Sequence, residues 1–383
     1  MVEKVDRETV PVGKTLADQQ RNAVLLSGYD YSKYPESITG YTGQDLQRIA
    51  FLRWEEAVRV RVGPRGNYKA GLTRFSDGTL VLVTAKKNRD PDPKKREALP
   101  SLLLVYESKD DGSTWQEIGE TQLGGKEPSL TTLPDGAIVL TAEGPSGGTE
   151  LDNTLISQSE DGGRTWETTI LPGYDCPRNL IVEPDGTLLM VRTLRSGWIH
   201  KGSGSPNFQL CRSQDHGKTW NLSEGLVDWD CTEFGEISAI RLRDGRFLAA
   251  VRRQVPGTKG EGFEDNMLTE STDGGLTWSK PRQMTNNAEV HVYLTELADG
   301  RILATYANYH LPYGSFAIVS CDHGMTWDLE HPIQLSLSAD IYVGWPATLQ
   351  LPDGRLITSY ASTTYYMEPP DNLTCEVVRW LLP

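Results

Sequence analysis

One eight-residue pattern, S-x-D-x-G-x-T-W, occurs five times and constrains the fold more than any other feature of the chain. Successive copies begin 51, 54, 58 and 49 residues apart, at Ser108, Ser159, Ser213, Ser271 and Ser320. This period is typical of a four-stranded β-propeller blade. Within each copy, Asp can accept hydrogen bonds from backbone amides, Gly allows a positive φ, and Trp can pack between blades. We therefore expect each copy to close an outer hairpin.

A second repeat, Asp-Gly between two apolar stretches, alternates with the first and occurs six times. The pairs begin at Asp77, Asp135, Asp185, Asp244, Asp299 and Asp353. Asp-Gly between two strand-like segments is a strong hairpin signal. Each blade is therefore predicted to begin with an inner hairpin closed at Asp-Gly, followed by an outer hairpin closed at the longer motif.

Six inner hairpins against five outer ones leave the last blade incomplete at the C-terminus. Residues 50–63 contain an alternation of apolar and polar residues and can supply the missing strand, which would remove the open edges of the ring. We predict an all-β fold, a six-bladed β-propeller with four-stranded antiparallel blades, in which this N-terminal segment closes the last blade. The propeller is expected to span residues 50–383, with residues 1–49 as an extension that packs on it.

Residues at equal distances from the Asp-Gly turns should occupy equivalent places around the ring. Eight residues before each Asp stand Lys69, Glu127, Pro177, Glu236, His291 and Trp345. Four of these six are ionisable, whereas a purely structural position would favour small or apolar residues. Because function concentrates at the mouth of a rigid scaffold, we expect this set to line the central funnel.

The residues eight positions after each Asp lie at the other end of the inner hairpin, beside the first set. Arg252 is then paired with Glu236, as a funnel pair or as a structural salt bridge. Glu143 is paired with Glu127. Two neighbouring carboxylates raise the pKa of one of them, which can keep a general acid protonated near neutral pH.

Two further sets of residues are candidates for the same funnel. Arg178 and Arg192 lie one residue away from the equivalent positions of the third blade. His291 and Tyr293 alternate onto one face of the fifth inner strand, so they can form a base and acid pair. In the other interpretation of this pair, His291 is a buried histidine hydrogen-bonded to a neighbour, and Tyr293 is an aromatic side chain that stacks on a sugar or packs in the core.

With these repeats the chain resembles the sialidase superfamily, whose members carry S-x-D-x-G-x-T-W, the Asp box, on six-bladed propellers. The resemblance covers about residues 50–383. It implies arginines that bind a substrate carboxylate, a tyrosine nucleophile activated by a glutamate, and an aspartate acid/base. The segment from Glu236 to Arg252 matches the glutamate and the second arginine of the family through the shared Asp-Gly.

Other family positions hold different residues. Lys69 stands at the place of the first arginine, where the compact ammonium of lysine replaces a planar guanidinium. Trp345 stands where the nucleophilic tyrosine is expected, with Tyr342 three residues earlier. Leu102 occupies the place of the acid/base aspartate. The resemblance therefore predicts a sugar site whose chemistry departs from that of the family.

Charge and composition exclude several classes of partner. The formal net charge of −14 repels nucleic acid and anionic lipid. Five scattered cysteines lack the spacing of a zinc site, so we expect no metal and no cofactor. The N-terminus has no apolar core and no apolar run reaches about 18 residues, which predicts no membrane span. The expected protein is cytoplasmic, or secreted with its leader removed.

The resemblance and the residues leave three functions open. The first is a glycoside hydrolase, exo-acting on sialic acid or a related acidic sugar. The second is a polysaccharide lyase or non-sialic glycosidase that uses His291 and Tyr293, and the third is a non-catalytic carbohydrate-binding propeller. The candidate catalytic residues are Glu236, His291, Tyr293 and Glu127, and the candidate substrate-binding residues are Arg252, Lys69, Arg178, Trp345 and Tyr342.

Overall fold

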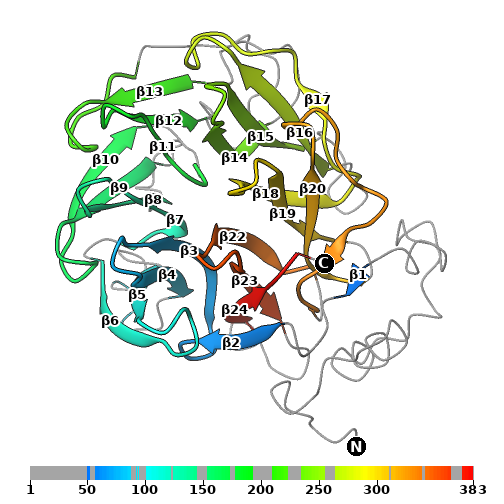
Figure 1. The fold of residues 1–383 in the computed structure, drawn as a ribbon. Coiled ribbons are helices and arrows are strands. Elements are labelled where there is room, and N and C mark those ends of the chain that lie inside the picture. Colours follow the sequence, from blue (N-terminus) through cyan, green and yellow to red (C-terminus); the bar gives the residue numbers. More distant parts are fainter. Residues whose placement is uncertain are drawn as a thin grey trace, which may run out of the picture.

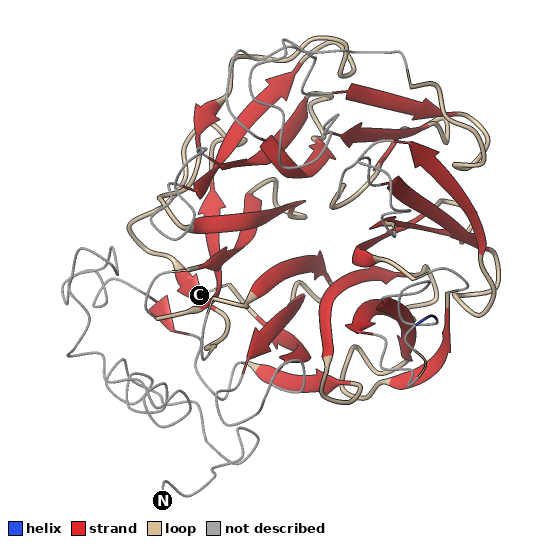
Figure 2. Cartoon of the chain, turned by 180° about the vertical axis from the view of Figure 1, so that it is seen from behind, coloured by secondary structure: helices blue, strands red, loops and turns tan. Residues whose placement is uncertain are grey.

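The computed structural model of the chain describes residues 50–51, 57–87, 92, 94, 101–121, 124–144, 153–172, 177–192, 209–222, 234–254, 264–309, 312–338, 341–363 and 373–382. Its strands form six sheets arranged in a ring, seen from opposite sides in Figures 1 and 2. The predicted six-bladed β-propeller is therefore confirmed. The expected extension over residues 1–49 lies outside the described residues.

The blades follow one another in chain order, and the first strand of each blade is the innermost (Figure 1). Blade one contains β3 (Asn67–Arg74), β4 (Leu80–Lys87), β5 (Ser101–Ser108) and β6 (Gln116–Glu120). Blade two contains β7 (Lys126–Thr132), β8 (Ile138–Glu143), β9 (Asn153–Ser159) and β10 (Glu167–Pro172). Blade three contains β11 (Ile181–Val182), β12 (Leu188–Arg192) and β13 (Gln209–Ser213).

Blade four contains β14 (Phe234–Arg241), β15 (Phe247–Gln254), β16 (Glu264–Ser271) and β17 (Arg282–Gln283). Blade five contains β18 (Glu289–Glu296), β19 (Ile302–Asn308), β20 (Gly314–Ser320) and β21 (Ile333–Gln334). Blade six contains β22 (Gly344–Gln350), β23 (Leu356–Thr363), β24 (Leu373–Trp380) and β2 (Val58–Val62). Among the described residues, blade three has three strands and a single bridge between Arg212 and Asn221 at its outer side.

The N-terminal part of the propeller closes the ring as predicted. β2 pairs antiparallel with β24, from Val58 opposite Arg379 to Val62 opposite Cys375. The preceding strand β1 (Ala50–Phe51) instead adds to blade five, where it pairs parallel with β21. The segment before blade one therefore covers the edges of two blades, which leaves fewer unpaired backbone groups at the rim.

The Asp-Gly pairs form the tight turns between the first and second strands. In blade one, the Gly78 amide donates to the Phe75 carbonyl at 3.1 Å and the Thr79 amide donates to Asp77 Oδ1 at 2.8 Å. The same carboxylate contact recurs at the other five turns. Gly78 has a φ of 95°, a conformation that glycine adopts at little cost.

The five octapeptides form a second type of turn after the third strand of a blade. Ser108 Oγ donates to Asp110 Oδ1 at 2.8 Å, and the Thr114 amide donates to the same oxygen at 2.8 Å. Hydrogen bonds from Thr114 and Ser108 lower the pKa of Asp110 to about 2. Equivalent Ser–Asp and Thr–Asp contacts recur in the other four copies. These turns stabilise the outer hairpins.

Both kinds of turn lie at the same end of a blade. Ser108 pairs with Leu80, which directly follows the Asp-Gly turn of blade one. Lys69 lies toward the opposite end of the same inner hairpin, one residue beyond the pairing of Tyr68 with Ala85. The start of each inner strand is therefore separated from the octapeptide turns by the length of the blade.

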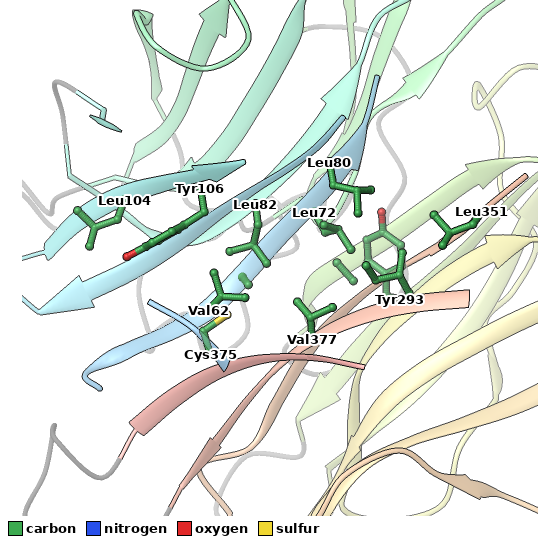
Figure 3. Close-up of a cluster of buried hydrophobic side chains, with 13 residues drawn as sticks. Val62, Leu72, Leu80, Leu82, Leu104, Tyr106, Tyr293, Leu351, Cys375 and Val377 are labelled. Atoms are coloured by element: carbon green, nitrogen blue, oxygen red, sulfur yellow. The ribbon is translucent and has the colours of Figure 1, made fainter. Parts of the chain in front are cut away.

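Apolar side chains fill the space between neighbouring blades. Val81 and Val83 of blade one pack with Leu130 and Leu140 of blade two. A corresponding cluster joins blade six to blade one, where Val62, Leu72 and Val377 meet (Figure 3). The contact between the last blade and the first fixes the ring and holds the inner strands in place around its centre.

Candidate active site

Five inner strands share an unusual backbone conformation near their starts. The five residues and their φ angles are Lys69 (51°), Glu127 (54°), Glu236 (47°), His291 (59°) and Trp345 (48°). These are the residues found eight positions before the Asp-Gly turns; the sixth, Pro177, has a ring that fixes φ at a negative value. In each of the five strands the pairing register shifts at this residue.

The left-handed conformation costs an L residue roughly 1–2 kcal/mol. A bulge re-aims the side chain at the point where it interrupts a strand, and strained backbone concentrates at functional sites. Five equivalent strained residues around one ring therefore point to a common function for their side chains.

Glu236 and Arg252 form the first contact of the site. Arg252 Nη1 donates to Glu236 Oε1 at 2.8 Å, and Nη2 donates to Glu264 Oε2 at 2.7 Å. Burial raises the pKa of Glu236, but His291 and Arg252 outweigh it and hold that pKa below its ordinary value. Glu236 is therefore a carboxylate at neutral pH, and the guanidinium spans two carboxylates from different strands.

His291 lies at the centre of the site and is 1% exposed. Its Nδ1 is hydrogen-bonded to Glu236 Oε2, and its Nε2 lies 2.6 Å from the hydroxyl of Tyr309. The ring also packs on Trp345, with centroids 4.4 Å apart. Burial lowers the pKa of His291 to about 4, although Glu236 opposes the shift. The imidazole is therefore neutral at neutral pH.

Lys69, Glu127 and Trp345 form the second part of the site. Lys69 Nζ is hydrogen-bonded to Glu127 Oε1 and lies 4.1 Å from the centroid of the Trp345 ring. Burial raises the pKa of Glu127, but the charge of Lys69 reverses the shift and lowers the pKa overall. The ammonium is thus held by a carboxylate and an aromatic face at once.

The two carboxylates of blade two have opposite pKa shifts, as the sequence predicts for such a pair. Burial and the charge of Glu127 raise the pKa of Glu143, although Lys126 Nζ donates to Glu143 Oε1 at 3.0 Å. Glu127 is thus the more acidic and Glu143 the less acidic of the two carboxyl groups. A pair of titratable groups with diverging pKa values is a common arrangement for acid and base catalysis.

The arginines of blade three occupy two different environments. Arg178 is 5% exposed, and its Nη2 donates to the carbonyl of Pro346 at 2.9 Å. Its charge lowers the pKa of both Glu236 and His291. Arg192 is 2% exposed and donates through Nε to Gln209 Oε1 at 3.0 Å.

Two predicted tyrosines lie elsewhere. Tyr293 packs in the apolar cluster with Leu72 and Leu351 (Figure 3), and His291 is hydrogen-bonded to Tyr309 in its place. The expected alternation of His291 and Tyr293 is wrong because the register shifts between Val290 and Tyr293. Tyr342 is 62% exposed, whereas Trp345 is 9% exposed and contacts His291.

We call this group of residues the central polar cluster, which consists of Lys69, Lys126, Glu127, Glu143, Arg178, Glu236, Arg252, Glu264, His291, Tyr309 and Trp345. Sequence reasoning missed Tyr309, Glu264 and Lys126. Tyr309 directly follows β19, and Glu264 and Lys126 begin β16 and β7. A search of residues next to the strand ends, rather than at one fixed offset, would have found all three.

Polar atoms of three cluster residues are buried without a hydrogen-bond partner among the described residues: Glu127 Oε2, Arg252 Nε and Trp345 Nε1. Buried polar groups are nearly always paired, because an unpaired one costs about 1–3 kcal/mol. One acceptor and two donors in a single cluster match the hydroxyl groups of a polar ligand.

The described residues contain no group of three or more His, Cys, Asp and Glu side chains that would hold a metal ion. In the same part of the chain, no helix has the length and apolar character needed to cross a membrane.

Comparisons with known proteins agree with the fold and its repeats. A sequence profile described as a BNR repeat-like domain matches residues 179–365. A xyloglucanase of Paenibacillus sp is 30% identical over 216 residues, which cover 51% of this chain and 20% of the xyloglucanase. A sialidase of Micromonospora viridifaciens is 26% identical over 204 residues, which cover 46% of this chain and 31% of the sialidase. The chain thus spans less than a third of these relatives.

The structure of a Penicillium chrysogenum α-L-arabinanase in complex with arabinobiose is also similar. The two superpose with a TM-score of 0.62 and 16% identity, covering 85% of this chain and 97% of the arabinanase. At this identity the similarity shows a shared fold.

Proposed function

We propose that this chain, a BNR-repeat propeller of the sialidase superfamily, is a glycoside hydrolase whose active site is the central polar cluster. The observation that carries the proposal is the set of unpaired buried atoms Glu127 Oε2, Arg252 Nε and Trp345 Nε1. A sugar offers hydroxyl groups that donate to a carboxylate and accept from an indole or a guanidinium. The xyloglucanase, sialidase and arabinanase among the similar proteins, which by name act on sugars, support the same class of substrate.

The carboxylates of the cluster supply the chemistry of glycoside hydrolysis. This reaction needs one carboxylic acid that protonates the leaving oxygen and one ionised group on the other side of the bond. Glu143 has the raised pKa that suits the proton donor. Glu236 stays ionised and orients His291. We therefore assign Glu143 as the acid and Glu236 as the group that assists the nucleophilic side.

The acidic-sugar prediction assigns the substrate carboxylate to Arg252 and Lys69. In the structure Arg252 bonds Glu236 and Glu264, and Lys69 bonds Glu127. A substrate carboxylate would have to displace one of these partners. Glu264 has a side-chain exposure of 31% against 12% for Glu236, so it is the partner that an acidic sugar would replace.

A substrate screen tests the proposal. The protein is incubated with neutral and acidic fluorogenic glycosides and with neutral and uronate-containing polysaccharides, and products are detected as reducing sugar and as absorbance of unsaturated ends. Release of reducing sugar without unsaturated product supports a hydrolase. Unsaturated product would select the lyase, and binding without turnover would select a carbohydrate-binding propeller.

Glu264→Gln separates the two classes of sugar. Loss of the competing carboxylate should lower KM for an acidic glycoside, because Arg252 Nη2 is then free of its anionic partner. Hydrolysis of a neutral glycoside should show no such gain. An unchanged KM for the acidic glycoside would end the acidic-sugar assignment while leaving the glycosidase proposal in place.

A further inference from the structure

We propose that Ile341 and Tyr342 form a leaving-group platform, a surface that binds the sugar on the far side of the bond to be cleaved. The proposal rests on the glycoside hydrolase function given above and adds a subsite outside the central polar cluster. Tyr342 is 62% exposed and Ile341 is 46% exposed. An aromatic ring and an aliphatic side chain together offer an apolar surface to the C–H face of a sugar ring, whose hydroxyl groups stay in water.

The location of this pair separates it from the other large apolar side chains that are exposed in the described part of the chain. Those lie in or next to the third or fourth strand of a blade: Val58, Ile170, Leu276, Met325, Leu329 and Leu381. Ile341 and Tyr342 lie just before β22, the inner strand of blade six. Single exposed apolar residues are common on any surface, whereas an adjacent pair beside a polar site is typical of ligand binding.

The chain that follows the leaving-group platform is held closely against blade five. Gly344 has a φ of 107°, and a Cβ added to it would lie 3.2 Å from the Cα of Ala307 in β19. The chain can approach Ala307 this closely because Gly344 has no side chain. Val343 is buried, and its amide donates to the carbonyl of Ile341 at 2.8 Å. The platform therefore has a fixed position at the boundary between blades five and six.

Trp345 connects the leaving-group platform to the central polar cluster. It follows Tyr342 by three residues, and its ring packs on His291 with the centroids 4.4 Å apart. Three residues of chain span at most about 11 Å, which sets an upper limit on the distance between the backbones of Tyr342 and Trp345. The platform is therefore within reach of a sugar that is linked to one bound at Trp345.

The burial of the cluster indicates which part of the substrate meets the leaving-group platform. His291 is 1% exposed and Trp345 is 9% exposed, against 62% for Tyr342. The end of a sugar chain can enter among buried side chains, and the rest of that chain then extends outward past exposed ones. An exo-acting hydrolase releases the terminal sugar, so the part that extends outward is the leaving group. Contacts with this remote part help to hold the reacting end in place.

Two substrates that release the same sugar test the proposal: a disaccharide that ends in the sugar identified by the screen, and the glycosyl fluoride of that sugar. The disaccharide places a sugar ring on Tyr342, whereas a fluoride ion is too small to reach it. In Tyr342→Ala, the ratio of kcat/KM for the disaccharide to kcat/KM for the fluoride should fall by about 3- to 10-fold, because one aromatic contact is lost. The ratio does not depend on the amount of folded protein. An unchanged ratio overturns the proposal.

Two further variants show whether the aromatic ring itself is responsible. Tyr342→Phe keeps the ring and removes the hydroxyl, so it should keep the ratio of the unaltered protein. Leu276→Ala is the matched control, because Leu276 is 51% exposed and lies in the fourth octapeptide, at the opposite end of a blade. Its ratio should equal that of the unaltered protein. A fall in Tyr342→Phe or in Leu276→Ala as large as that in Tyr342→Ala would contradict the stacking role of Tyr342.

The leaving-group platform and the glycosidase function fail independently. A protein that cleaves glycosides with an unchanged ratio in Tyr342→Ala keeps the function and loses the platform. If the screen finds no hydrolysis, binding of its 4-methylumbelliferyl glycosides is measured by fluorescence polarisation. Weaker binding by Tyr342→Ala than by the unaltered protein keeps a sugar-binding platform and ends the glycosidase function. Equal binding by the two proteins, or no binding by either, overturns the platform as well.

Discussion

Glu236 of β14 and His291 of β18 are 55 positions apart in the chain, yet the carboxylate accepts a hydrogen bond from the imidazole Nδ1 across neighbouring blades. Both residues have a positive φ at the same point of their strands. The contact therefore depends on two repeats adopting the same strained conformation. A β-propeller brings such equivalent positions to one axis, which is how distant segments form one site.

Replacing Arg252 with Lys should reduce catalysis more than stability. The guanidinium bonds Glu236 and Glu264 with separate nitrogens, and an ammonium cannot reproduce that fork. The loss of one charge-assisted hydrogen bond, worth about 1.5–3 kcal/mol, corresponds to a roughly 10- to 100-fold lower kcat/KM on the sugar found in the screen. Turnover and thermal midpoint are measured on the same preparations.

Arg253→Lys is the matched control for this substitution. Arg253 is the next residue of β15 and pairs with the buried Asp265. Its replacement should lower the thermal midpoint without a comparable loss of turnover. If both substitutions reduced turnover equally, Arg252 would have no special place in the reaction.

Lys69 and Glu127 should show strong coupling in a double-mutant cycle. Lys69→Met leaves Glu127, which is 8% exposed, without its cation, and breaking a buried pair in this way costs about 3–5 kcal/mol. Lys69→Met combined with Glu127→Gln removes both charges and should recover most of that loss. Urea unfolding gives the four free energies, and additive effects would show that the pair is not coupled.

The left-handed backbone at Lys69 predicts that a glycine variant is more stable than an alanine variant there, the reverse of the order expected within a regular strand. In the Glu127→Gln background, Lys69→Gly should be more stable than Lys69→Ala by about 1 kcal/mol, because glycine tolerates a φ of 51°. At Arg61, an exposed residue of β2, alanine should be the more stable by roughly 0.5–1 kcal/mol. Urea unfolding of the four variants is the measurement. The same order at both positions would contradict the strained conformation.

These strained residues also show how far the sequence predicts the site. The spacing of the Asp-Gly turns identified Lys69, Glu127, Glu236, His291 and Trp345 because each repeat places the same point of a strand at the same place in the ring. Hairpin signals and the missing outer hairpin likewise predicted the blades and the role of β2. Local patterns carry this information, since each turn is encoded by adjacent residues.

The errors arise where contacts depend on geometry that a repeat does not encode. Tyr293 was expected beside His291, but the bulge in β18 breaks the alternation and sends Tyr293 into the apolar cluster. Tyr309 has no counterpart in the offset scheme, because it follows the end of β19. A strand pattern cannot predict either position until the location of the bulge is known.

The pH dependence of stability should report the burial of His291. Its pKa of about 4 lies below the unfolded value of about 6.5, so between these values the unfolded chain binds the proton more strongly. The contribution of His291 to the free energy of unfolding is therefore complete above pH 6.5 and is lost as the pH falls toward 4. The loss amounts to about 2 kcal/mol between pH 7 and pH 5.

Urea unfolding at pH 7 and pH 5 measures this loss in the unaltered protein and in His291→Gln, which has no group to protonate in this range. On acidification, the free energy of unfolding of the variant should fall by about 2 kcal/mol less than that of the unaltered protein. Equal losses in both proteins would show that His291 is not buried in its neutral form.

The most direct test of the glycosidase site is the turnover of Glu236→Gln on the sugar that the unaltered protein cleaves, measured as reducing sugar released per folded molecule. Glutamine keeps the shape of Glu236 and removes the carboxylate that holds His291 and Arg252. We predict a fall in kcat of about 10²–10⁴, with a protein that remains folded at the assay temperature. Full turnover by folded Glu236→Gln would contradict the assignment of the central polar cluster as the active site.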